Sequence, residues 1–467
     1  MSLSGPRDLA VHTTSIPGLL VVDLPVHGDN RGWFKENWQR SKMEAIGLPD
    51  FHPVQNNVSY NASVGTTRGI HAEPWDKFVS VAHGRVFAAW VDLRDGPTFG
   101  ATFTIEIDES VAVYVPRGVG NSYQTLEPDT AYTYLVNAHW SADAQEEYRF
   151  LNMADPSANI NWPISLSDAE VSDKDKNHPA LADVRPMKPR AIVILGANGQ
   201  VGNALQREFP DAIALTRNDF DVTDPGAYAT FDWSGVEVLI NAAAYTKVDA
   251  SETDGRSAAW AINVTATALM ATAARDNDLT LVHLSSDYVF DGVQSEHPED
   301  EPVAPIGVYG QTKAAADALV STVEKHYVVR TSWVIGDGAN FVRTMFMLAQ
   351  KGVDPAVVDD QVGQLTFASE LARAIKHLLS DRPAYGVYNV TNSGEPTTWF
   401  EVARAVFAEA GHSDQRVSPV STADYSVGKE LAPRPANSVL PLGKIRATGF
   451  EPLPAVDVLR EYVKNLS

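Results

Sequence analysis

The sequence predicts a multidomain protein in which an all-β domain, either a barrel or a double-sheet jelly roll, precedes a doubly wound parallel α/β domain. Three observations lead to this fold class. The chain has 467 residues, of which 44% are hydrophobic, so it is about three times as long as a typical domain and can fill more than one core. Short alternating apolar runs dominate up to about residue 150. After about residue 190, strand-like and helix-like runs alternate.

The β-rich half is predicted from period-two patterning. Phe103, Ile105 and Ile107 alternate with polar residues, which is the period of a half-buried strand. Turn signals such as His83-Gly84 separate this run from others of the same kind. Many short strands joined by tight turns are typical of a barrel or a jelly roll. The other strand-like runs are 79–81, 86–91, 111–115 and 132–136.

A domain junction is predicted where the patterning stops. The stretch 155–189 is rich in Pro, Asp, Ser and Lys and lacks a sustained period. We therefore expect a first domain at 1–183, a linker at 184–189 and a second domain at 190–467.

The second half begins with a compact apolar strand at 190–195 that leads into Gly196-Ala197-Asn198-Gly199-Gln200-Val201-Gly202. Glycines in such a strand-to-helix turn let backbone N–H groups approach a pyrophosphate at the helix N-terminus. A tight turn that needs glycine only for steric reasons is the alternative, but the place directly after the first strand favours dinucleotide binding. The alternation continues with strands expected at 236–240, 279–284 and 327–330.

Composition excludes several partners. The formal net charge of −22 argues against nucleic acid, because a phosphate backbone requires a basic face. There is no cysteine, which excludes disulfides and thiolate chemistry and fits a reducing cytoplasm. The N-terminus lacks a secretion signal, and no apolar run approaches the roughly 20 residues that span a bilayer. We therefore expect a cytoplasmic protein without nucleic-acid or membrane partners, whose anionic ligands are held by local positive charge.

A second motif of the α/β half is Tyr309-Gly310-Gln311-Thr312-Lys313, in which Tyr and Lys share one helix face. An ammonium beside a phenol lowers the phenol pKa, so such a tyrosine can protonate the oxygen of a carbonyl that accepts hydride. The lysine can also hold the nicotinamide ribose. A surface tyrosine with a solvated lysine is the alternative for any isolated pair of this kind.

With these motifs in place, residues 190–467 resemble the extended short-chain dehydrogenase/reductase superfamily and, within it, the dTDP-4-dehydrorhamnose reductases. The resemblance implies a Rossmann fold with a smaller substrate-binding subdomain. The matching segments beyond the two motifs are 241–246, Val248-Asp249, 285–290, 330–333, Asp360-Gln361, Arg434-Pro435 and Asn437-Ser438.

The resemblance implies that Ser286 positions a C4 carbonyl, that Tyr309 protonates it, and that Lys313 completes the catalytic set. The cofactor site is expected to comprise Gly196, Asn198, Gly199, Gln200, Val201, Gly202, Arg217, Asp221, Ala242, Ala243, Tyr245, Tyr309 and Lys313. Substrate-side positions are Trp333, Asn340 and Arg434, for which core packing, a loop cap and a surface charge are the structural alternatives.

The preferred cofactor follows from the end of the second strand, which reads Ala214-Leu215-Thr216-Arg217. It lacks the acidic residue that binds a free ribose 2′-hydroxyl, and Arg217 favours a 2′-phosphate. We therefore predict NADPH, with NADH as the alternative.

The first half resembles dTDP-4-dehydrorhamnose 3,5-epimerase over about residues 15–180, which implies a cupin jelly roll. No metal is predicted, because metal-binding cupins cluster two His and a Glu, which His71-Ala72-Glu73 does not supply. The segments that carry the resemblance are 29–34, 55–57, 68–71, Lys77, 97–100, 115–118, Tyr134 and 172–175.

Removal of a proton α to a ketone requires a base, stabilisation of the enolate oxygen and an acid on the opposite face. The resemblance assigns His71 as the base, oriented by Asp175, and Tyr134 as the acid, for which barrel-core packing is the alternative. Lys77 is assigned to the enolate. The residues expected to hold the sugar nucleotide are Arg31, Glu36, Gln55, Asn57 and Arg68.

Together the halves predict a bifunctional enzyme of dTDP-L-rhamnose biosynthesis that uses a dTDP-sugar and forms a homodimer through the cupin domain. The sequence departs from the epimerase pattern at two positions, where Asn121 replaces a histidine and Val58 follows Gln55-Asn56-Asn57. Two alternatives therefore remain open. One is a related deoxysugar pathway with a single epimerisation, and the other is a reductase joined to a degenerate cupin module for binding or dimerisation.

Overall fold

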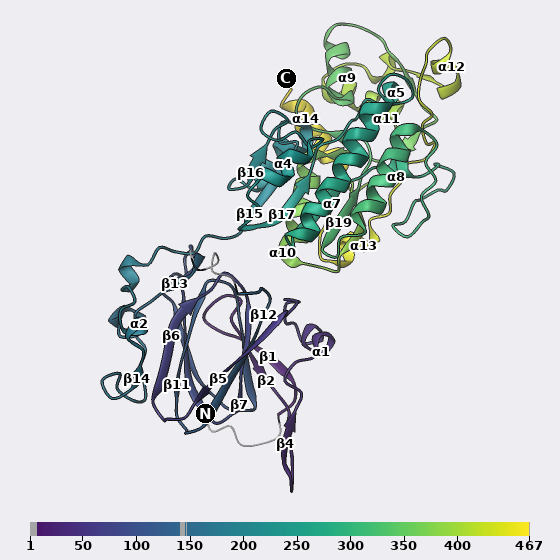
Figure 1. The fold of residues 1–467 in the computed structure, drawn as a ribbon. Coiled ribbons are helices and arrows are strands. Elements are labelled where there is room, and N and C mark those ends of the chain that lie inside the picture. Colours follow the sequence, from purple (N-terminus) through teal and green to yellow (C-terminus); the bar gives the residue numbers. More distant parts are fainter. Residues whose placement is uncertain (1–6, 141–144, 146, 467) are drawn as a thin grey trace. The chain divides into compact units, whose positions relative to one another are not determined.

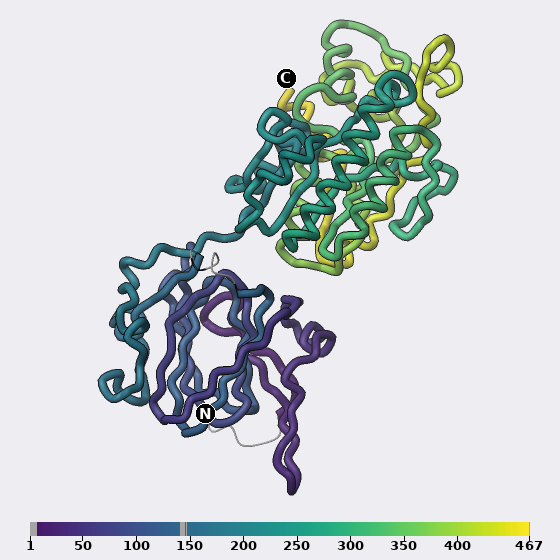
Figure 2. The backbone as a smooth tube through the Cα atoms, viewed as in Figure 1, coloured from purple at the N-terminus to yellow at the C-terminus, as the bar shows by residue number. Residues whose placement is uncertain are grey.

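The computed structural model describes residues 7–140, 145 and 147–466. It divides into two compact units, Met1–Pro189 and Arg190–Ser467. The chain passes once from the first unit to the second (Figure 2).

The first unit is built on two large sheets whose main strands are antiparallel (Figure 1), with β14 parallel to β6 and a separate β3–β4 hairpin. One has the strand order β1-β2-β10-β7-β12-β5, and the other has the order β13-β6-β11-β8-β9, with β14 beside β6. The elements are β1 (Ala10–Thr13), β2 (Leu20–Asp23), β3 (Val26–Asp29), β4 (Gly32–Lys35), α1 (Arg40–Ala45), β5 (Gln55–Asn61), β6 (Thr66–Ala72), β7 (Lys77–His83), β8 (Val86–Asp92), β9 (Thr102–Ile107), β10 (Val111–Val115), β11 (Val119–Thr125), β12 (Thr130–Val136), β13 (Arg149–Phe150), η2 (Pro156–Ala158), β14 (Glu170–Val171), α2 (Asp173–Lys176) and η3 (Leu181–Asp183).

The main core of this unit lies between the two sheets. Val79 on β7 and Val113 on β10 pack in one cluster with Ala88 and Trp90 on β8. Because side chains alternate between the two faces of a strand, each sheet contributes one apolar face to this core. The predicted all-β fold is confirmed, and the double-sheet jelly roll is the form that it takes.

The β3–β4 hairpin extends from the body of the first unit (Figure 1). Trp33 is 44% exposed and Phe34 is 70% exposed on it. Neither side chain contributes to the sandwich core, so the hairpin presents apolar surface of the kind that marks an interaction site.

The second unit is built on a six-stranded sheet whose strands are all parallel, in the order β16-β15-β17-β18-β19-β24. Ile194 and Ile240 contact α10 residues on one face, whereas Val193 and Leu239 contact α7 residues on the other. Helices on both faces make the sheet doubly wound, as predicted. The strands are β15 (Ala191–Leu195), β16 (Ile213–Leu215), β17 (Val236–Asn241), β18 (Thr280–Leu284), β19 (His326–Arg330) and β24 (Gly386–Asn389).

The helices of this unit either cover the faces of the sheet or, with three pairs of short strands, belong to a smaller subdomain. The helical segments are α3 (Gln200–Glu208), α4 (Pro225–Thr230), α5 (Val248–Ser251), α6 (Arg256–Trp260), η4 (Ala261–Thr265), α7 (Ala266–Asp276), η5 (Asp287–Val289), α8 (Val308–Val320), α9 (Phe341–Gln350), α10 (Ala368–Asp381), α11 (Trp399–Glu409), η6 (Asp414–Arg416), α12 (Thr422–Ser426), α13 (Gly443–Ala447) and α14 (Ala455–Lys464). The short strand pairs are β20 (Val334–Ile335) with β23 (Thr366–Phe367), β21 (Ala356–Val358) with β26 (Ser418–Val420), and β22 (Val362–Gly363) with β25 (Thr397–Thr398). A separate core joins α9, α11 and α14 through Val342, Phe407 and Leu459.

The segment expected as a linker, 184–189, packs on the first unit. The Met187 N–H donates to the Leu93 carbonyl at 2.8 Å, and the Asp95 N–H donates to the Met187 carbonyl at 2.9 Å. The Met187 side chain is 1% exposed. The boundary between the units therefore falls between Pro189 and Arg190. The Pro-rich segment 184–189 belongs to the first unit and is held there by backbone hydrogen bonds and by the buried Met187 side chain.

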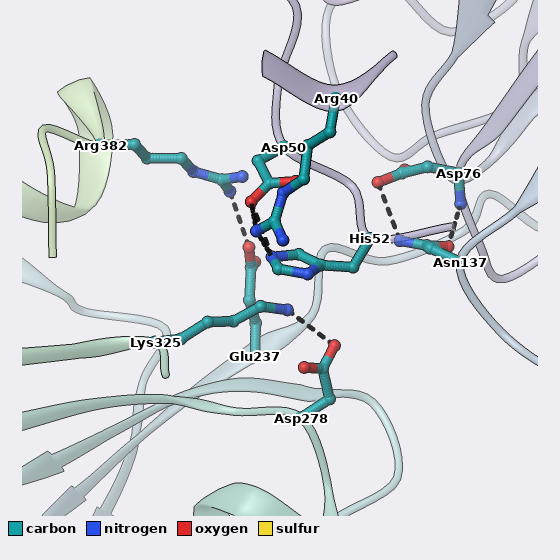
Figure 3. A network of polar contacts seen from close by, with 9 residues as sticks. All are labelled: Arg40, Asp50, His52, Asp76, Asn137, Glu237, Asp278, Lys325 and Arg382. Atoms are coloured by element: carbon teal, nitrogen blue, oxygen red, sulfur yellow. Dashed lines mark hydrogen bonds and ion pairs between the residues drawn. The ribbon is translucent and has the colours of Figure 1, made fainter. Parts of the chain in front are cut away.

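Figure 3 shows polar contacts that tie loops and strand ends within the units, among them those of Asp50 with Arg40 and His52. In the second unit, Lys325 lies 2.7 Å from Asp278, and Arg382 lies 2.7 Å from Glu237. In the first unit, the Asp76 N–H donates to the Asn137 side chain at 2.9 Å. Within the described residues, no helix is both long enough and apolar enough to cross a membrane.

Candidate active sites

The first unit contains a cavity of about 490 Å³ that collects most of the predicted epimerase residues. His71 and Arg68 come from β6, Lys77 comes from β7, and Tyr134 comes from β12. Asp175 reaches the same cavity from α2. The cavity is lined by Ser59, Thr66, Thr67, Arg68, Gly69, His71, Glu73, Lys77, Asn121, Tyr123, Tyr132, Tyr134, Glu170, Val171, Ser172 and Asp175.

His71 and Asp175 form the predicted pair, with His71 Nε2 2.9 Å from Asp175 Oδ1. The Ser172 side chain accepts a hydrogen bond from the Asp175 N–H and thereby caps the N-terminus of α2, the helix that carries Asp175. Burial opposes ionisation of Asp175, but the hydrogen bond and the charge of His71 outweigh it and lower the pKa of this carboxyl. The His71 side chain is 34% exposed, so the base is accessible while its carboxylate is buried.

Lys77 is buried and forms an ion pair with Glu73, which sequence analysis considered only as a metal ligand. Lys77 Nζ lies 5.8 Å from the centre of the Tyr134 ring. Both residues stand near strand ends that Asp76 and Asn137 hold together (Figure 3). Burial raises the pKa of Tyr134, and the Glu73 carboxylate adds to the effect, so this phenol keeps its proton at neutral pH.

Asn121, which stands where the resembled family has histidine, lies directly opposite His71 in the β11–β6 register. The Tyr132 hydroxyl donates to the Asn121 side-chain oxygen at 3.1 Å. Arg68 contacts Asn61 through a hydrogen bond of 3.0 Å. The substitution therefore places a neutral amide beside the base and leaves the His71–Asp175 pair intact.

The remaining predicted sugar-nucleotide residues lie outside this cavity. Arg31 is on the β3–β4 hairpin, 85% exposed and paired with Asp29. Glu36 follows the hairpin and contacts Lys42 at 2.8 Å. On edge strand β5, Gln55 donates to Asn57 at 2.9 Å. These substrate-contact assignments therefore stay predictions.

In the second unit, the glycine turn connects β15 to α3. Gly196 has φ +78°, and a Cβ atom there would lie 2.6 Å from the Ala243 backbone nitrogen, so glycine is required by conformation and by close approach. Gly199 begins α3, whose first N–H groups have no side-chain cap. An adjoining cavity of about 220 Å³ is lined by Gly196, Asn198, Gly199, Arg217, Phe220, Asp221, Val222, Thr223, Ala242, Ala243, Ala244 and Ile262.

This cavity suits the pyrophosphate and adjoining part of a dinucleotide, because uncapped N–H groups at a helix N-terminus suit a pyrophosphate and Arg217 supplies positive charge. The predicted cofactor residues that do not line it are Gln200, Val201, Gly202, Tyr245, Tyr309 and Lys313. Val201 packs on the sheet core, and the Gln200 side chain donates to the Ala339 carbonyl at 3.4 Å. The Tyr245 N–H donates to the Asn263 side chain at 2.8 Å. Gly202 supports the turn, because a Cβ atom there would lie 2.2 Å from the Gly196 carbonyl oxygen.

Ser286, Tyr309 and Lys313 lie at the carboxyl ends of the parallel strands and on α8. Burial and the Asp287 charge raise the pKa of Tyr309 to about 12, although the hydrogen bond with Ser286 acts to lower it. The lowered tyrosine pKa expected from the sequence is therefore wrong for this arrangement. Burial instead lowers the pKa of Lys313 to about 8. Lys313 Nζ donates to the Leu284 carbonyl at 2.5 Å and lies 3.4 Å from His283 Nε2.

Asp287 is a buried carboxyl that sequence analysis did not single out. Its Oδ1 accepts a hydrogen bond from Ser286 at 2.9 Å, and burial raises its pKa to about 6. Its position inside the 285–290 segment, which carries the resemblance to the reductases, was the sequence signal that could have identified it. Because it contacts Ser286 and raises the Tyr309 pKa, it belongs to the polar surroundings of the catalytic set.

The smaller subdomain holds a cavity of about 640 Å³ whose lining includes Trp399 and Arg434. Trp333 stacks on Trp399 with ring centres 3.9 Å apart. Arg434 is paired with Asp249 at 2.8 Å. The Asn340 side chain accepts from the Arg343 N–H at 2.9 Å and therefore caps α9. Packing and capping thus account for Trp333 and Asn340, and their substrate contacts stay predictions.

Among the described residues, one group of three could ligate a metal ion. His71, Asp175 and His178 each offer a ligand atom, and these atoms lie within 4.8 Å of one another. The sequence search considered only ligands close in the chain and so did not find His178.

The fold and the two sites define a two-domain chain with a cupin acid–base site and a dinucleotide-binding reductase site. The chain belongs to two enzyme families: residues 13–183 match the family model for dTDP-4-dehydrorhamnose 3,5-epimerase, and residues 190–467 match the RmlD substrate binding domain. The predicted family memberships are confirmed.

Individual relatives divide in the same way. A Streptococcus pyogenes protein named RmlC homolog is 53% identical over 182 residues, which are 38% of this chain and 91% of that protein. The dTDP-4-dehydrorhamnose reductase of Aggregatibacter actinomycetemcomitans is 36% identical over 282 residues, covering 56% of this chain and 94% of that protein. A Bacillus anthracis dTDP-4-dehydrorhamnose reductase, solved in complex with NADP, is 32% identical with a TM-score of 0.55, covering 60% of this chain and 99% of that one.

Proposed function

We propose that this chain catalyses two consecutive steps of dTDP-L-rhamnose formation. The first unit epimerises dTDP-4-dehydro-6-deoxyglucose at C3 and C5, and the second unit reduces the C4 ketone of the product with NADPH. The observation that supports this proposal is that His71, Asp175, Lys77 and Tyr134 meet in one cavity of the first unit. The predicted reductase residues Ser286, Tyr309 and Lys313 are all buried or held by hydrogen bonds in the second unit.

In the epimerase cavity, His71 removes a proton from the carbon next to the ketone, and the Asp175 carboxylate stabilises the imidazolium that results. Lys77 holds the developing enolate oxygen. Tyr134, whose pKa is raised by burial, returns a proton to the carbon from the other face. Arg68 provides positive charge for the sugar nucleotide in a chain of net charge −22. None of these steps uses a metal.

In the reductase, NADPH supplies the hydride when it is bound. The glycine turn and the α3 N-terminus hold the pyrophosphate, and Arg217 holds the 2′-phosphate. Ser286 positions the C4 oxygen, and Tyr309 donates its proton to that oxygen. Because the pKa of Tyr309 is raised to about 12, the phenol is protonated before each turnover. Lys313 orients the ribose of the cofactor.

The geometry favours an active epimerase over a degenerate binding module, because the base, its carboxylate and the lysine meet in one cavity. Asn121 keeps a single epimerisation as the second candidate, since an amide replaces an imidazole beside His71. The stereochemistry of the product separates these two enzymes.

A homodimer through the first unit is part of the proposal. Arg31 and Glu36 lie on or next to an exposed apolar hairpin and outside the cavity of their own chain. A hairpin inserted into a second copy would bring them to that copy's cavity and would cover Trp33 and Phe34. A cytoplasmic location accords with the use of NADPH and with a cysteine-free sequence.

The test is incubation of the purified chain with dTDP-4-dehydro-6-deoxyglucose and NADPH in deuterated water, followed by NMR of the sugar. Deuterium at both C3 and C5 of a rhamnose product is the expected result. Deuterium at one carbon supports the single epimerisation, and its absence with NADPH still consumed supports the binding module. His71→Ala and Tyr309→Phe are matched controls that each remove one activity and leave the other.

A further inference from the structure

The Asp175 carboxylate has two imidazole neighbours. Its Oδ1 lies 2.9 Å from His71 Nε2 and 3.8 Å from His178 Nε2. Its other oxygen accepts a longer hydrogen bond, of 3.4 Å, from the Gly69 N–H. The two imidazole rings lie 5.3 Å apart between centres. Asp175 Oδ1 therefore has one nitrogen of each imidazole, His71 Nε2 and His178 Nε2, close to it.

His178 is the unexplained member of this group. Its side chain is 6% exposed, and the ring stacks on Phe150 at 4.7 Å between centres. Among the described residues, neither ring nitrogen of His178 has a hydrogen-bond partner of normal geometry. Burial and the His71 charge lower the pKa of His178, and the neutral form of an imidazole offers one ring nitrogen as a metal ligand. A buried imidazole without a hydrogen bond is costly and indicates a function.

We propose that His71, Asp175 and His178 form a binding site for a divalent cation of the zinc class, and that the bound metal inhibits the epimerase. The site takes Zn²⁺ as an inhibitor and has no part in turnover. Inhibition rests on the proposed epimerase function, whereas metal binding does not depend on it.

The ligand chemistry agrees with this class of cation. Two neutral imidazoles and one carboxylate suit Zn²⁺, Co²⁺ and Ni²⁺, whereas Mg²⁺ and Ca²⁺ prefer oxygen ligands. Zinc–ligand distances of about 2.0–2.1 Å place tetrahedral ligands about 3.4 Å apart. The separations of 2.9 and 3.8 Å from Asp175 Oδ1 lie on either side of that value, and all the ligand atoms lie within 4.8 Å of one another, so side-chain rotation can bring the three ligands to one ion.

The cavity provides the rest of the coordination sphere and the reason for inhibition. His71 is 34% exposed and lines the 490 Å³ cavity, so a fourth position opens towards the substrate site. A metal bound at His71 Nε2 replaces the hydrogen bond to Asp175 and leaves the one proton of the neutral ring on Nδ1, so His71 has no lone pair with which to accept the substrate proton. Proton abstraction then stops, whereas the reductase site is in the other unit and lacks these ligands.

The experiment is titration of the full chain, freed of metal with a chelator, with Zn²⁺ by calorimetry and with Co²⁺ by visible absorption. One metal per chain is expected, with the intense absorption of a low-coordinate cobalt ion. His178→Phe is expected to weaken Zn²⁺ affinity by about 10- to 100-fold or more. His83→Phe is the matched control, because His83 also lies 3.8 Å from a carboxylate, that of Glu109, but is 66% exposed. It is expected to leave the affinity unchanged.

The activity assay separates the two proposals. Zn²⁺ is expected to stop deuterium exchange into the sugar and to leave reduction of dTDP-4-dehydrorhamnose unchanged, and His178→Phe is expected to restore exchange in the presence of Zn²⁺. His178→Gln serves if the phenylalanine variant fails to fold. Equal Zn²⁺ affinity of wild type and either folded His178 variant would overturn the metal site. Stoichiometric binding in a chain without any exchange activity would instead contradict the epimerase function.

Discussion

Nε2 of His71 lies 2.9 Å from Oδ1 of Asp175, although 104 positions separate the two residues. The contact arises because β6 carries His71 along the cavity wall while the β14–α2 segment returns beside the same strand. The Ser172 cap on α2 fixes the direction of the Asp175 side chain. The basicity of His71 therefore depends on Asp175, which lies near the end of the first unit.

The first prediction concerns this pair. Asp175→Asn is expected to lower epimerase kcat by about 100-fold or more, because an amide cannot stabilise the imidazolium. Reduction of dTDP-4-dehydrorhamnose by the same preparation should be unchanged, and an unchanged unfolding transition of the first unit by calorimetry should show that this unit is folded. Deuterium exchange at C3 and C5, followed by NMR, measures the loss. Exchange at the wild-type rate would contradict the role of Asp175.

The second prediction is that the catalytic efficiency of the reductase falls at high pH. Burial lowers the pKa of Lys313 to about 8 while that of Tyr309 is raised to about 12. The kcat/KM for NADPH is therefore expected to fall above pH 8, as Lys313 loses its charge while Tyr309 is still protonated. A profile measured from pH 6 to 10 tests this. A constant value to pH 10 would show that Lys313 does not titrate in this range.

The same lysine affects stability with a defined sign. Its pKa in the folded chain, about 8, is below its ordinary value of 10.5. The unfolded chain thus binds more protons between these values, and the contribution of Lys313 to the free energy of unfolding rises with pH over that window. Lys313→Met should remove this rise, as measured by urea unfolding at pH 8 and pH 10.

The third prediction concerns Asp287, whose pKa is raised by burial to about 6. The folded chain binds more protons than the unfolded chain between about pH 4 and 6, so stability falls as pH rises through this window. Asp287→Asn is expected to stabilise the second unit at pH 8 by about 2–3 kcal/mol, since one pKa unit corresponds to about 1.4 kcal/mol.

Calorimetry tests this prediction, with the transition of the second unit identified by its upward shift on addition of NADPH. The stabilisation should disappear at pH 4, where wild-type Asp287 is protonated. A variant that is less stable than wild type at pH 8 would show that the charged carboxylate has compensating contacts.

The fourth prediction concerns cofactor choice. Arg217 lines the dinucleotide cavity beside Asp221. Arg217→Ala is expected to weaken NADPH binding by about 10- to 100-fold, the usual effect of losing a charge-assisted hydrogen bond, and to leave NADH binding nearly unchanged. Fluorescence titration with each cofactor measures both constants. Equal losses for the two cofactors would assign Arg217 to the shared part of the dinucleotide.

The fifth prediction concerns assembly. Replacement of Trp33 and Phe34 by serine is expected to convert a dimer into a monomer, because both exposed side chains lie on the hairpin. Sedimentation equilibrium measures the change. Val293→Ser, at a site that is 77% exposed in the second unit, is the control. A wild-type chain that sediments only as a monomer would contradict the proposed homodimer.

Local sequence patterns were sufficient for the fold of both units. The run 111–115 is predicted as a strand and forms β10, and the glycine turn 196–202 forms the bend into α3. These features are set by side-chain alternation and by backbone conformation, which depend on neighbouring residues. The composition of 184–189 does not reveal that Met187 is buried and forms a bridge with Arg94.

The sequence by itself determined the two families, the order of the domains and the chemical groups available for catalysis, because these are recorded in motifs a few residues long. Only the tertiary structure decided which groups meet. It placed Asp175 and His178 beside His71, brought Lys77 to Tyr134, and buried Tyr309 so that its pKa rises. Proximity and desolvation depend on chain segments far apart in sequence, and so no local pattern specifies them.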